Sequence, residues 1–331
     1  MSGRKQAVPS ERGGSRTAFV LSGGGSLGAL QVGMLRALFE HGLRPDLLVG
    51  TSVGAVNAAF IASRAPSAAT ADQLAEVWCR LSREDVFPFS PRALIVGLAG
   101  RRDHLVPDRG LRRLVEQHVE FADIGEASIP LHIVAFDVNE QAEVLLSEGP
   151  AVDVIVGAAS IPGVFPTVRI GTRLLVDGGV ANNTPLSHAV ALGAERVFVF
   201  PTRDPHSHTG GPSRGAIGAA IDGIGVLTDA RLRFDLKRYS SDVELIVLPC
   251  PNRLRVAATD FGHSSQLIKE ACHATRAFLE PKRGALRRAR SGRRDRERRV
   301  ANPGRSPQGN PRRTANTTRS TVRHSAIAGH G

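Results

Sequence analysis

The chain has 331 residues, of which 41% are hydrophobic, and a formal net charge of +12. This length and apolar content fit a sizeable folded core with short extensions. Three cysteines without metal-ligand spacing exclude a disulfide framework and a cysteine-based metal centre, and no run of about 18 apolar residues indicates a membrane span. We expect a protein that requires no cofactor and no metal.

The first predicted unit is a strand, a glycine-rich turn and a helix. The apolar run 18–21 precedes Gly23-Gly24-Gly25-Ser26-Leu27-Gly28, and an amphipathic pattern follows over 28–41. Main-chain N–H groups in such a turn point at any anion above them. The anion can be a phosphate or the oxyanion of a tetrahedral acyl intermediate.

The second predicted unit contains a serine between two glycines. Gly50-Thr51-Ser52-Val53-Gly54 has the G-x-S-x-G spacing of a nucleophile elbow, a sharp turn from strand to helix. The apolar run 47–49 fits the strand, and the small apolar residues of 55–62 fit the helix. Gly50 and Gly54 let the backbone turn without a Cβ clash. An ordinary turn between two glycines has the same five-residue pattern. The assignment as a nucleophile elbow therefore depends on the strand-like and helix-like segments on either side.

The glycine-rich turn also satisfies a different fingerprint. Gly23, Gly25 and Gly28 give G-x-G-x-x-G, which is typical of a Rossmann-type nucleotide-binding domain. Such a domain needs an acidic residue about 20 positions later, at the end of the second strand. Asp46 lies near that distance but precedes the apolar run 47–49. Acyl chemistry is therefore favoured, with nucleotide binding as an alternative.

A candidate base for the serine lies about 125 residues further on, because a serine nucleophile needs an adjacent base. Asp177 follows the strand-like run 173–176 and precedes Gly178-Gly179, a turn that presents the carboxylate at the sheet edge. Partial burial in an apolar pocket would make this carboxylate a better base. An isolated Asp-Gly-Gly is more often a turn whose aspartate bonds its own backbone. The other two motifs reverse that preference here.

These three motifs, in this order, resemble the patatin-like phospholipases over roughly residues 18–199. Two longer stretches, 158–166 and 177–185, are similar to segments of bacterial members. The resemblance implies an α/β fold, a patatin-like three-layer sandwich with a mostly parallel central sheet. It also implies a lipid acyl hydrolase that cleaves carboxylic esters of phospholipids, lysophospholipids or related acyl lipids through an acyl-enzyme.

Residue roles follow from the resemblance by position. Ser52 is implied as the nucleophile and Asp177 as the base of a catalytic dyad without histidine. The implied oxyanion loop is Gly23, Gly24, Gly25 and Gly28, and the remaining motif glycines are Gly50, Gly54, Gly178 and Gly179. Many members carry Lys or Arg before the last loop glycine, where this chain has Leu27. That departure removes a cation but leaves the main-chain donors.

Two further classes remain open. A Ser-Asp-His esterase of the α/β-hydrolase type would use Ser52, Asp177 and His263, the chain order of that fold. Such a fold places several strands before the serine, and the roughly 50 residues that precede Ser52 are too few for them. We therefore rank this interpretation second. The other class is a non-catalytic lipid-binding module that keeps the fold.

The remaining pattern alternates between strands and helices, which predicts a mostly parallel sheet with helices on both faces. We expect further strands at 131–137, 143–146, 173–176, 196–200 and 243–248. Further helices are expected at 70–82, 109–119, 152–159, 185–192, 216–238 and 264–280. The apolar stretch 86–106 is interrupted by Pro and Gly, and we interpret it as a lid or lipid-facing loop, or else as irregular core.

The positive charge belongs to the end of the chain. Residues 281–331 contain fifteen Lys or Arg and two acids, so residues 1–280 sum to about −1. We expect a flexible segment 1–16, a catalytic domain 17–280 and a disordered Arg-rich tail 281–331. The tail favours peripheral contact with an anionic membrane surface, or else is a solvated extension. No zinc pattern and few aromatic residues argue against specific nucleic-acid binding.

A signal peptide is not indicated, because residues 1–15 lack an apolar segment. We expect a cytoplasmic enzyme that meets membranes at their surface. The sequence sets no oligomeric state.

Overall fold

The computed structural model describes residues 15–88, 104–204, 216–251 and 256–280, with only the backbone of 216–225. All of them belong to one compact unit within Met1–Lys282. The predicted tail 281–331, nearly all of segment 1–16 and the middle of the stretch 86–106 lie outside the described residues.

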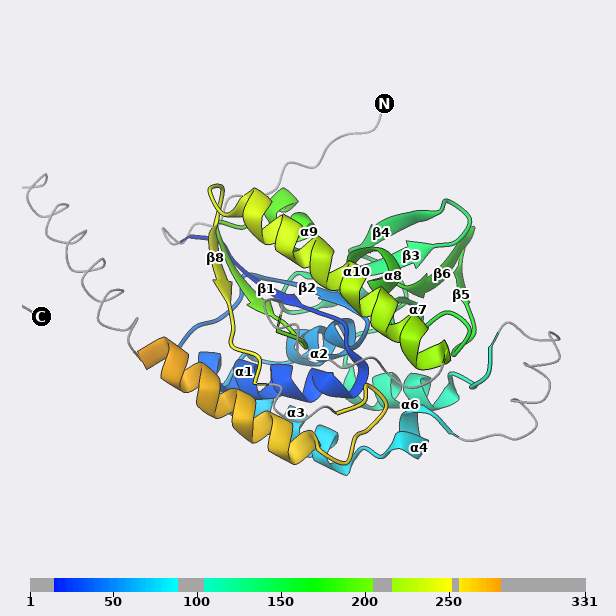
Figure 1. The fold of residues 1–331 in the computed structure, drawn as a ribbon, viewed down its shortest axis with the longest axis horizontal. Coiled ribbons are helices and arrows are strands. Elements are labelled where there is room, and N and C mark those ends of the chain that lie inside the picture. Colours follow the sequence, from blue (N-terminus) through cyan, green and yellow to red (C-terminus); the bar gives the residue numbers. More distant parts are fainter. Residues whose placement is uncertain (1–14, 89–103, 205–215, 252–255, 281–331) are drawn as a thin grey trace, which may run out of the picture. The chain divides into compact units, whose positions relative to one another are not determined.

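Eight strands of the described chain form one mixed sheet (Figure 1). Parallel pairs link β1 to β2 and β7, β2 to β3, and β7 to β8, while β4, β5 and β6 join antiparallel. The strands are β1 Thr17–Leu21, β2 Leu47–Thr51, β3 Leu131–Asp137, β4 Ala142–Leu146, β5 Val168–Ile170, β6 Arg173–Asp177, β7 Arg196–Phe200 and β8 Glu244–Val247.

Helices cover both faces of this sheet, which gives three layers. Figure 1 shows α9 and α10 on one side and α1, α3 and the helix over 264–280 on the other. The longer helices are α1 Gly28–Glu40, α2 Val53–Ala62, α3 Ala68–Arg80, α6 Arg109–His118, α7 Ala151–Ala158 and α10 Ala216–Tyr239. The shorter helices are α4 Arg83–Val86, α8 Gly179–Asn182 and α9 Leu186–Ala191.

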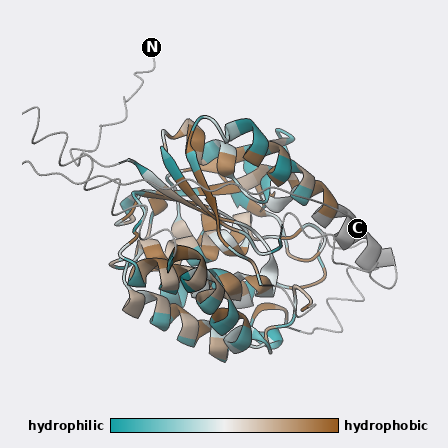
Figure 2. Ribbon diagram, turned by 60° about the vertical axis from the view of Figure 1, so that its left-hand side comes forward, coloured by the Kyte–Doolittle hydropathy of each residue, from teal (hydrophilic) through white to brown (hydrophobic). Residues whose placement is uncertain are grey.

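Alternation along the buried strands creates two separate cores. Phe19 and Leu21 of β1 point to the side of α1 and α2, whereas Ala18 and Val20 point to the side of α9 and α10. Successive strand residues face opposite sides, so a central strand covered on both faces is apolar throughout. Figure 2 shows this as hydrophobic colour along the central strands.

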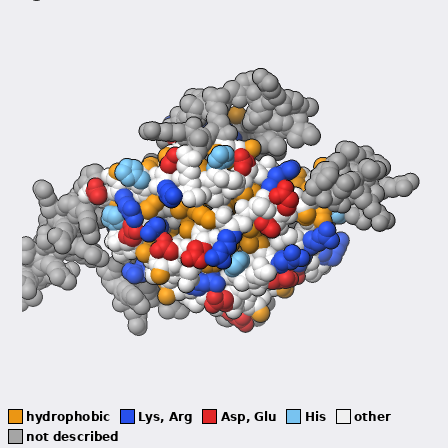
Figure 3. Space-filling view, turned by 90° about the horizontal axis from the view of Figure 1, so that it is seen from below, with side chains coloured by type: hydrophobic (Ala, Val, Ile, Leu, Met, Phe, Trp, Pro, Cys, Tyr) orange, Lys and Arg blue, Asp and Glu red, His pale blue; other side chains and the backbone are white. Residues whose placement is uncertain are grey.

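Ion pairs tie the outer helices together at the surface. Arg276, on the helix over 264–280, contacts Glu40 of α1 through two 2.6 Å hydrogen bonds. Arg36 of α1 lies 3.3 Å from Glu40 and 3.2 Å from Asp72 of α3. The view from below in Figure 3 shows acidic and basic side chains intermixed with apolar ones.

The mixed pairing of β3 brings two distant chain segments together. β4 pairs with residues 133–137 of β3, β2 with 131–134 and β6 with 135–137. Because β4 overlaps both partners, β2 and β6 must share the opposite edge of β3. They run toward each other there, with Thr51 opposite Val134 and Asp177 opposite Ala135. The carboxyl ends of β2 and β6 therefore meet.

Most predicted elements are confirmed within a few residues. The pattern missed β5, which has only three residues, and the one-turn helices α4 and α8. The Gly178-Gly179 turn proves to be the start of α8, where the Asn182 amide bonds the Gly178 carbonyl. Among the described helices, none has both the length and the apolar composition to cross a bilayer.

Candidate active site

Ser52 occupies the sharp turn between β2 and α2. Its backbone has φ 56° and ψ −128°, a conformation that costs a non-glycine residue about 1–3 kcal/mol. A Cβ at Gly50 would lie 2.6 Å from the Gly54 carbonyl oxygen, and one at Gly54 would overlap the Leu21 carbonyl oxygen. Only glycine fits at these two positions, so the elbow predicted from the spacing is confirmed as local geometry.

Asp177 accepts a hydrogen bond from this serine. The Ser52 hydroxyl Oγ lies 2.6 Å from Asp177 Oδ2, and the Gly179 amide donates to Asp177 Oδ1 at 2.7 Å. Both residues are buried: Ser52 is 8% exposed and Asp177 is 6% exposed. Sequence reasoning expected this pair, and the head-to-head meeting of β2 and β6 explains how 125 residues of separation close to one hydrogen bond.

Burial changes the acidity of the carboxylate. It raises the pKa of Asp177 to about 6, against the hydrogen bonds from Ser52 and Gly179, which lower it. Neither of these donors is a cation, so little counteracts the cost of burying the charge. A carboxylate with this pKa is a stronger base than an exposed one and is still ionised near neutral pH.

The glycine-rich turn lies beside the serine, and its four glycines differ in role. The Gly23 amide bonds the Asn183 carbonyl at 3.0 Å, and the Gly28 amide bonds carbonyls within the turn. Within the described chain, the amides of Gly24 and Gly25 have no hydrogen-bond partner. Of the four amides in the predicted oxyanion loop, two are therefore engaged and two are available, and the loop's role towards an oxyanion stays a prediction.

Gly23 and Gly28 are instead required by close packing. A Cβ at Gly23 would lie 2.9 Å from Ser52 Cβ, and one at Gly28 would lie 2.6 Å from a methyl group of Val53. The amide of Val53, the first residue of α2, also has no partner among the described residues. Helix N-terminal amides of this kind are the natural third donor to an oxyanion.

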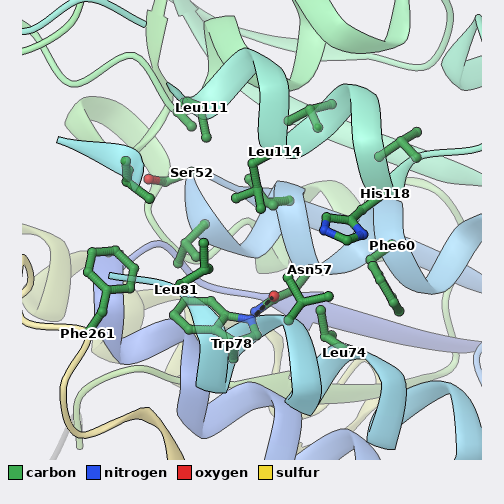
Figure 4. Close-up of a pocket in the computed structure, with 18 of the residues that line it drawn as sticks. Ser52, Asn57, Phe60, Leu74, Trp78, Leu81, Leu111, Leu114, His118 and Phe261 are labelled. Atoms are coloured by element: carbon green, nitrogen blue, oxygen red, sulfur yellow. Dashed lines mark hydrogen bonds between the residues drawn. The ribbon is translucent and has the colours of Figure 1, made fainter. Parts of the chain in front are cut away.

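An apolar cavity opens beside the hydroxyl. Figure 4 shows Ser52 on one side of it, His118 and Phe60 on the far side, and Leu114 between them. Its walls come mainly from α2, α3, α4 and α6 and from Phe165 and Phe261. Val86 and Phe87 line it as well, so the start of the stretch interpreted as a lid or lipid-facing loop borders the cavity.

The histidine alternative finds no support in the contacts. His263 lies 3.5 Å from Asp260, and His188 lies 3.6 Å from Glu143. The described partners of the Asp177 carboxylate are the Ser52 hydroxyl and the Gly179 amide, with no imidazole between them.

The nucleotide alternative also disagrees with the fold. Asp46 accepts a hydrogen bond from the Thr17 amide at 2.8 Å. It therefore lies at the amino end of parallel β1 and β2, whereas the glycine-rich turn follows the carboxyl end of β1. In the described chain no group of three or more acidic, histidine or cysteine side chains could hold a metal ion.

A family comparison agrees with this geometry. The family model described as patatin-like phospholipase matches residues 19–190. The chain belongs to this family. The match contains the glycine-rich turn, Ser52 and Asp177, and it ends before β7.

Curated patatin-like relatives are much longer proteins. Lysophospholipase NTE1 of Mycosarcoma maydis is 26% identical over 193 residues, which is 56% of this chain and 10% of that protein. Patatin-like phospholipase domain-containing protein 6 of Homo sapiens is 27% identical over 190 residues, 56% of this chain and 13% of that protein. The chain thus corresponds to a small fraction of these relatives' length.

Among solved structures, VipD from Legionella pneumophila has a TM-score of 0.42 with 13% identity, covering 81% of this chain and 67% of that chain. ExoU in complex with SpcU from Pseudomonas aeruginosa has a TM-score of 0.36 with 16% identity, covering 80% of this chain and 52% of that chain.

Several groups around the patatin-like site were not expected from the sequence. Thr202 and Asn183 donate to the Gly23 carbonyl, and Ala257 and Ala258 accept from Ser26 through their carbonyls. The contact between Ser26 and Ala257 crosses 231 residues, and the contacts from Thr202 and the two alanines come from outside the family match. Leu27, which replaces a common cation, is buried in the core, so its side chain has no polar role.

Proposed function

We propose that this patatin-like chain is a serine lipid acyl hydrolase that cleaves carboxylic esters of phospholipids, lysophospholipids or related acyl lipids. The observation that carries the proposal is the 2.6 Å hydrogen bond from Ser52 to a buried carboxylate at the edge of an apolar cavity. A nucleophile, a base and an acyl-binding wall are the parts that ester hydrolysis requires.

The acylation step uses the two side chains in turn. Ser52 Oγ attacks the acyl carbonyl carbon while Asp177 accepts the hydroxyl proton. The carbonyl oxygen becomes an oxyanion, which the amides of Gly24, Gly25 and Val53 stabilise. Collapse of the intermediate breaks the ester C–O bond, and the leaving alcohol takes the proton from Asp177. The product is an acyl-enzyme on Ser52.

Deacylation repeats the sequence with water. Water gives a proton to Asp177 as its oxygen attacks the acyl-enzyme carbonyl, and the same amides stabilise the second oxyanion. Ser52 Oγ then leaves, recovers the proton and releases the carboxylic acid. The elbow helps both steps, because its strained backbone keeps the hydroxyl fixed while bonds form and break.

The cavity favours an acyl chain over a polar substituent. Apart from Ser52, Gly25, Asn57 and His118, the residues that line it are apolar or aromatic. Burial and the nearby Arg64 cation lower the pKa of His118, which favours the neutral imidazole at the far side. A neutral wall suits a hydrocarbon tail, and a lipid held this way leaves its headgroup toward solvent or a membrane surface.

An activity-based probe tests the nucleophile. Wild-type protein should react with a fluorophosphonate, and Ser52→Ala should not, because only an activated serine is labelled. Ser63→Ala is the matched control, since Ser63 lies at the other end of α2, where its hydroxyl donates to the Ala59 carbonyl and accepts from the Glu120 amide. Labelling of Ser52→Ala equal to wild type would contradict the proposal, and an unlabelled wild type would favour a non-catalytic lipid-binding module.

Chain-length dependence tests the cavity. Leu114→Trp narrows its middle, so kcat/KM should fall for p-nitrophenyl dodecanoate and change little for p-nitrophenyl butyrate. Equal loss on both esters would mean that the acyl chain lies elsewhere.

A further inference from the structure

Three buried polar side chains lie beneath the glycine-rich turn, one on each of α1, α2 and α3. Gln31 and Asn57 are fully buried, and Trp78 is 4% exposed. Burying an amide or an indole N–H without a partner costs about 1–3 kcal/mol, so apolar residues are the usual choice at such positions. These three form a connected network instead.

The network uses every one of its N–H groups. Gln31 Nε2 donates to the carbonyls of Ser22 at 2.7 Å and Phe200 at 3.2 Å. Asn57 Nδ2 donates to the Gly28 carbonyl at 3.1 Å and to Gln31 Oε1 at 2.9 Å. Trp78 Nε1 donates to Asn57 Oδ1 at 3.0 Å, the bond drawn in Figure 4. A fully satisfied network of this kind specifies one arrangement.

The network bonds the backbone at both ends of the glycine-rich turn. Ser22 immediately precedes Gly23, and Gly28 closes the turn, so the carbonyls held by Gln31 and Asn57 flank the amides of Gly24 and Gly25. Glycines have no side chains with which to anchor their own backbone. An oxyanion donor must nevertheless lie within about 2.7–3.1 Å of the developing charge. Something outside the turn has to fix its position.

Asn57 also connects the turn to the nucleophile. It lies on α2, the helix that begins directly after Ser52, so one rigid helix carries both the serine and the clamp on Gly28. Trp78 sets the direction of that clamp, because its N–H requires the Asn57 amide oxygen and leaves the nitrogen for Gly28.

We propose that Asn57, held by Gln31 and Trp78, is a positioning residue that fixes the glycine-rich turn relative to Ser52 for oxyanion stabilisation. The proposal rests on the proposed hydrolase function. It assigns these three residues no contact with the reacting atoms. Their effect is exerted through the carbonyls of Ser22 and Gly28.

The test compares three substitutions that remove polar atoms, of which Gln31→Met and Asn57→Leu nearly keep the side-chain volume and Trp78→Phe reduces it. Gln31→Met and Asn57→Leu should lower kcat on p-nitrophenyl butyrate by about tenfold to a hundredfold with little change in KM, because a misplaced donor weakens transition-state binding. Trp78→Phe should lower kcat less, since Asn57 keeps its bond to Gly28. The control is Val197→Ala, which destabilises the opposite core without touching the turn.

Two measurements separate positioning from general destabilisation. Amide hydrogen exchange of residues 22–28 should be faster in Gln31→Met and Asn57→Leu than in Val197→Ala at equal loss of Tm. The emission of Trp78, the single tryptophan of the chain, should shift in Asn57→Leu because its N–H loses its acceptor.

Each outcome decides the proposal. Lower kcat with unchanged KM and faster exchange in the turn supports it. Unchanged kcat, unchanged exchange, or an equal loss of kcat in Val197→Ala overturns it. If the wild type neither hydrolyses esters nor reacts with a fluorophosphonate, the proposed function fails, and the exchange data alone decide whether the network anchors the turn.

Discussion

Two buried aspartates lie close together in the pairing of β3 with β6, and their surroundings differ. Asp137, 2% exposed, accepts from the amides of Asn139 at 3.0 Å and Leu174 at 3.4 Å, with Arg173 4.0 Å away. Asp177, 6% exposed, accepts from one amide and from the Ser52 hydroxyl, with no cation in contact.

Under the proposed function, the difference separates a structural carboxylate from a reactive one. Asp137 accepts hydrogen bonds from main-chain amides that hold a turn in place. Asp177 has a pKa raised to about 6 by burial, and its second oxygen faces a hydroxyl that can give up a proton. Two buried residues of the same type thus differ in their donors, and the Ser52 hydroxyl is bonded to Asp177 alone of the two.

Matched substitutions give the largest expected contrast. Asp177→Asn removes the base while keeping shape, so kcat on a chromogenic ester should fall by about 10²–10⁴-fold. Asp137→Asn should leave kcat within about twofold, because it touches no reacting atom. Steady-state kinetics on both variants measures this, with circular dichroism as the check on folding. Near-normal turnover in Asp177→Asn would show that another group is the base.

The free energy of unfolding should rise in Asp177→Asn, although kcat falls. The folded state raises the pKa of Asp177 from 3.8 to about 6, so ionisation costs folding free energy that grows as pH rises through this window. Asp177→Asn should therefore be more stable than wild type at pH 8 by up to about 3 kcal/mol, with the gap closing below pH 4. Urea unfolding at several pH values tests the sign.

Asp137→Asn should instead lose stability, by about 1 kcal/mol, because a neutral acceptor replaces a charged one. The same urea experiment measures it. If both variants change stability in the same direction, the contrast drawn between the two sites does not hold.

The pH dependence of catalysis offers a third, smaller test. Asp177 must be ionised to act as base, so kcat/KM should rise about tenfold per pH unit up to about pH 6 and then level off. Asp137→Asn should keep this limb unmoved. A limb that disappears in His263→Ala would favour the imidazole alternative.

The weakest expected effect concerns the cation beside Asp137. Arg173 is half exposed and its Nε lies 4.0 Å from the carboxylate, so solvent screens the pair. Arg173→Gln should lower the free energy of unfolding by less than about 1 kcal/mol and leave kcat unchanged. A larger loss would mean that the cation, more than the amides, stabilises Asp137.

Local patterns in the sequence predicted most of the fold. Short apolar runs such as 18–21 and 197–200 predicted strands that the structure confirms, and glycine spacing predicted the elbow around Ser52. Three-residue β5 has no detectable period, and the four-residue α8 begins at Gly179 directly after Gly178, so neither has a local signal.

The Ser52–Asp177 pair was predictable because each residue lies in its own short motif. Partial burial of Asp177 was named from the sequence only as a condition for a better base, and the burial found depends on packing that no motif describes. In the sequence, nothing distinguishes Gln31, Asn57 and Trp78 from ordinary helix residues. Their importance arises from contacts between helices, which a single sequence does not reveal.

The shared edge of β3 has a consequence for how lipid preference could change under the proposed function. Strand register delivers the serine and the aspartate, while α3, α4 and α6 supply much of the cavity wall from one excursion of the chain between them. Replacing residues 68–118 with a different segment should alter which acyl chains the cavity accepts. The positions of Ser52 and Asp177 should stay unchanged, because strand register sets them. In such a protein, one part of the chain determines the reaction and another part determines the substrate preference.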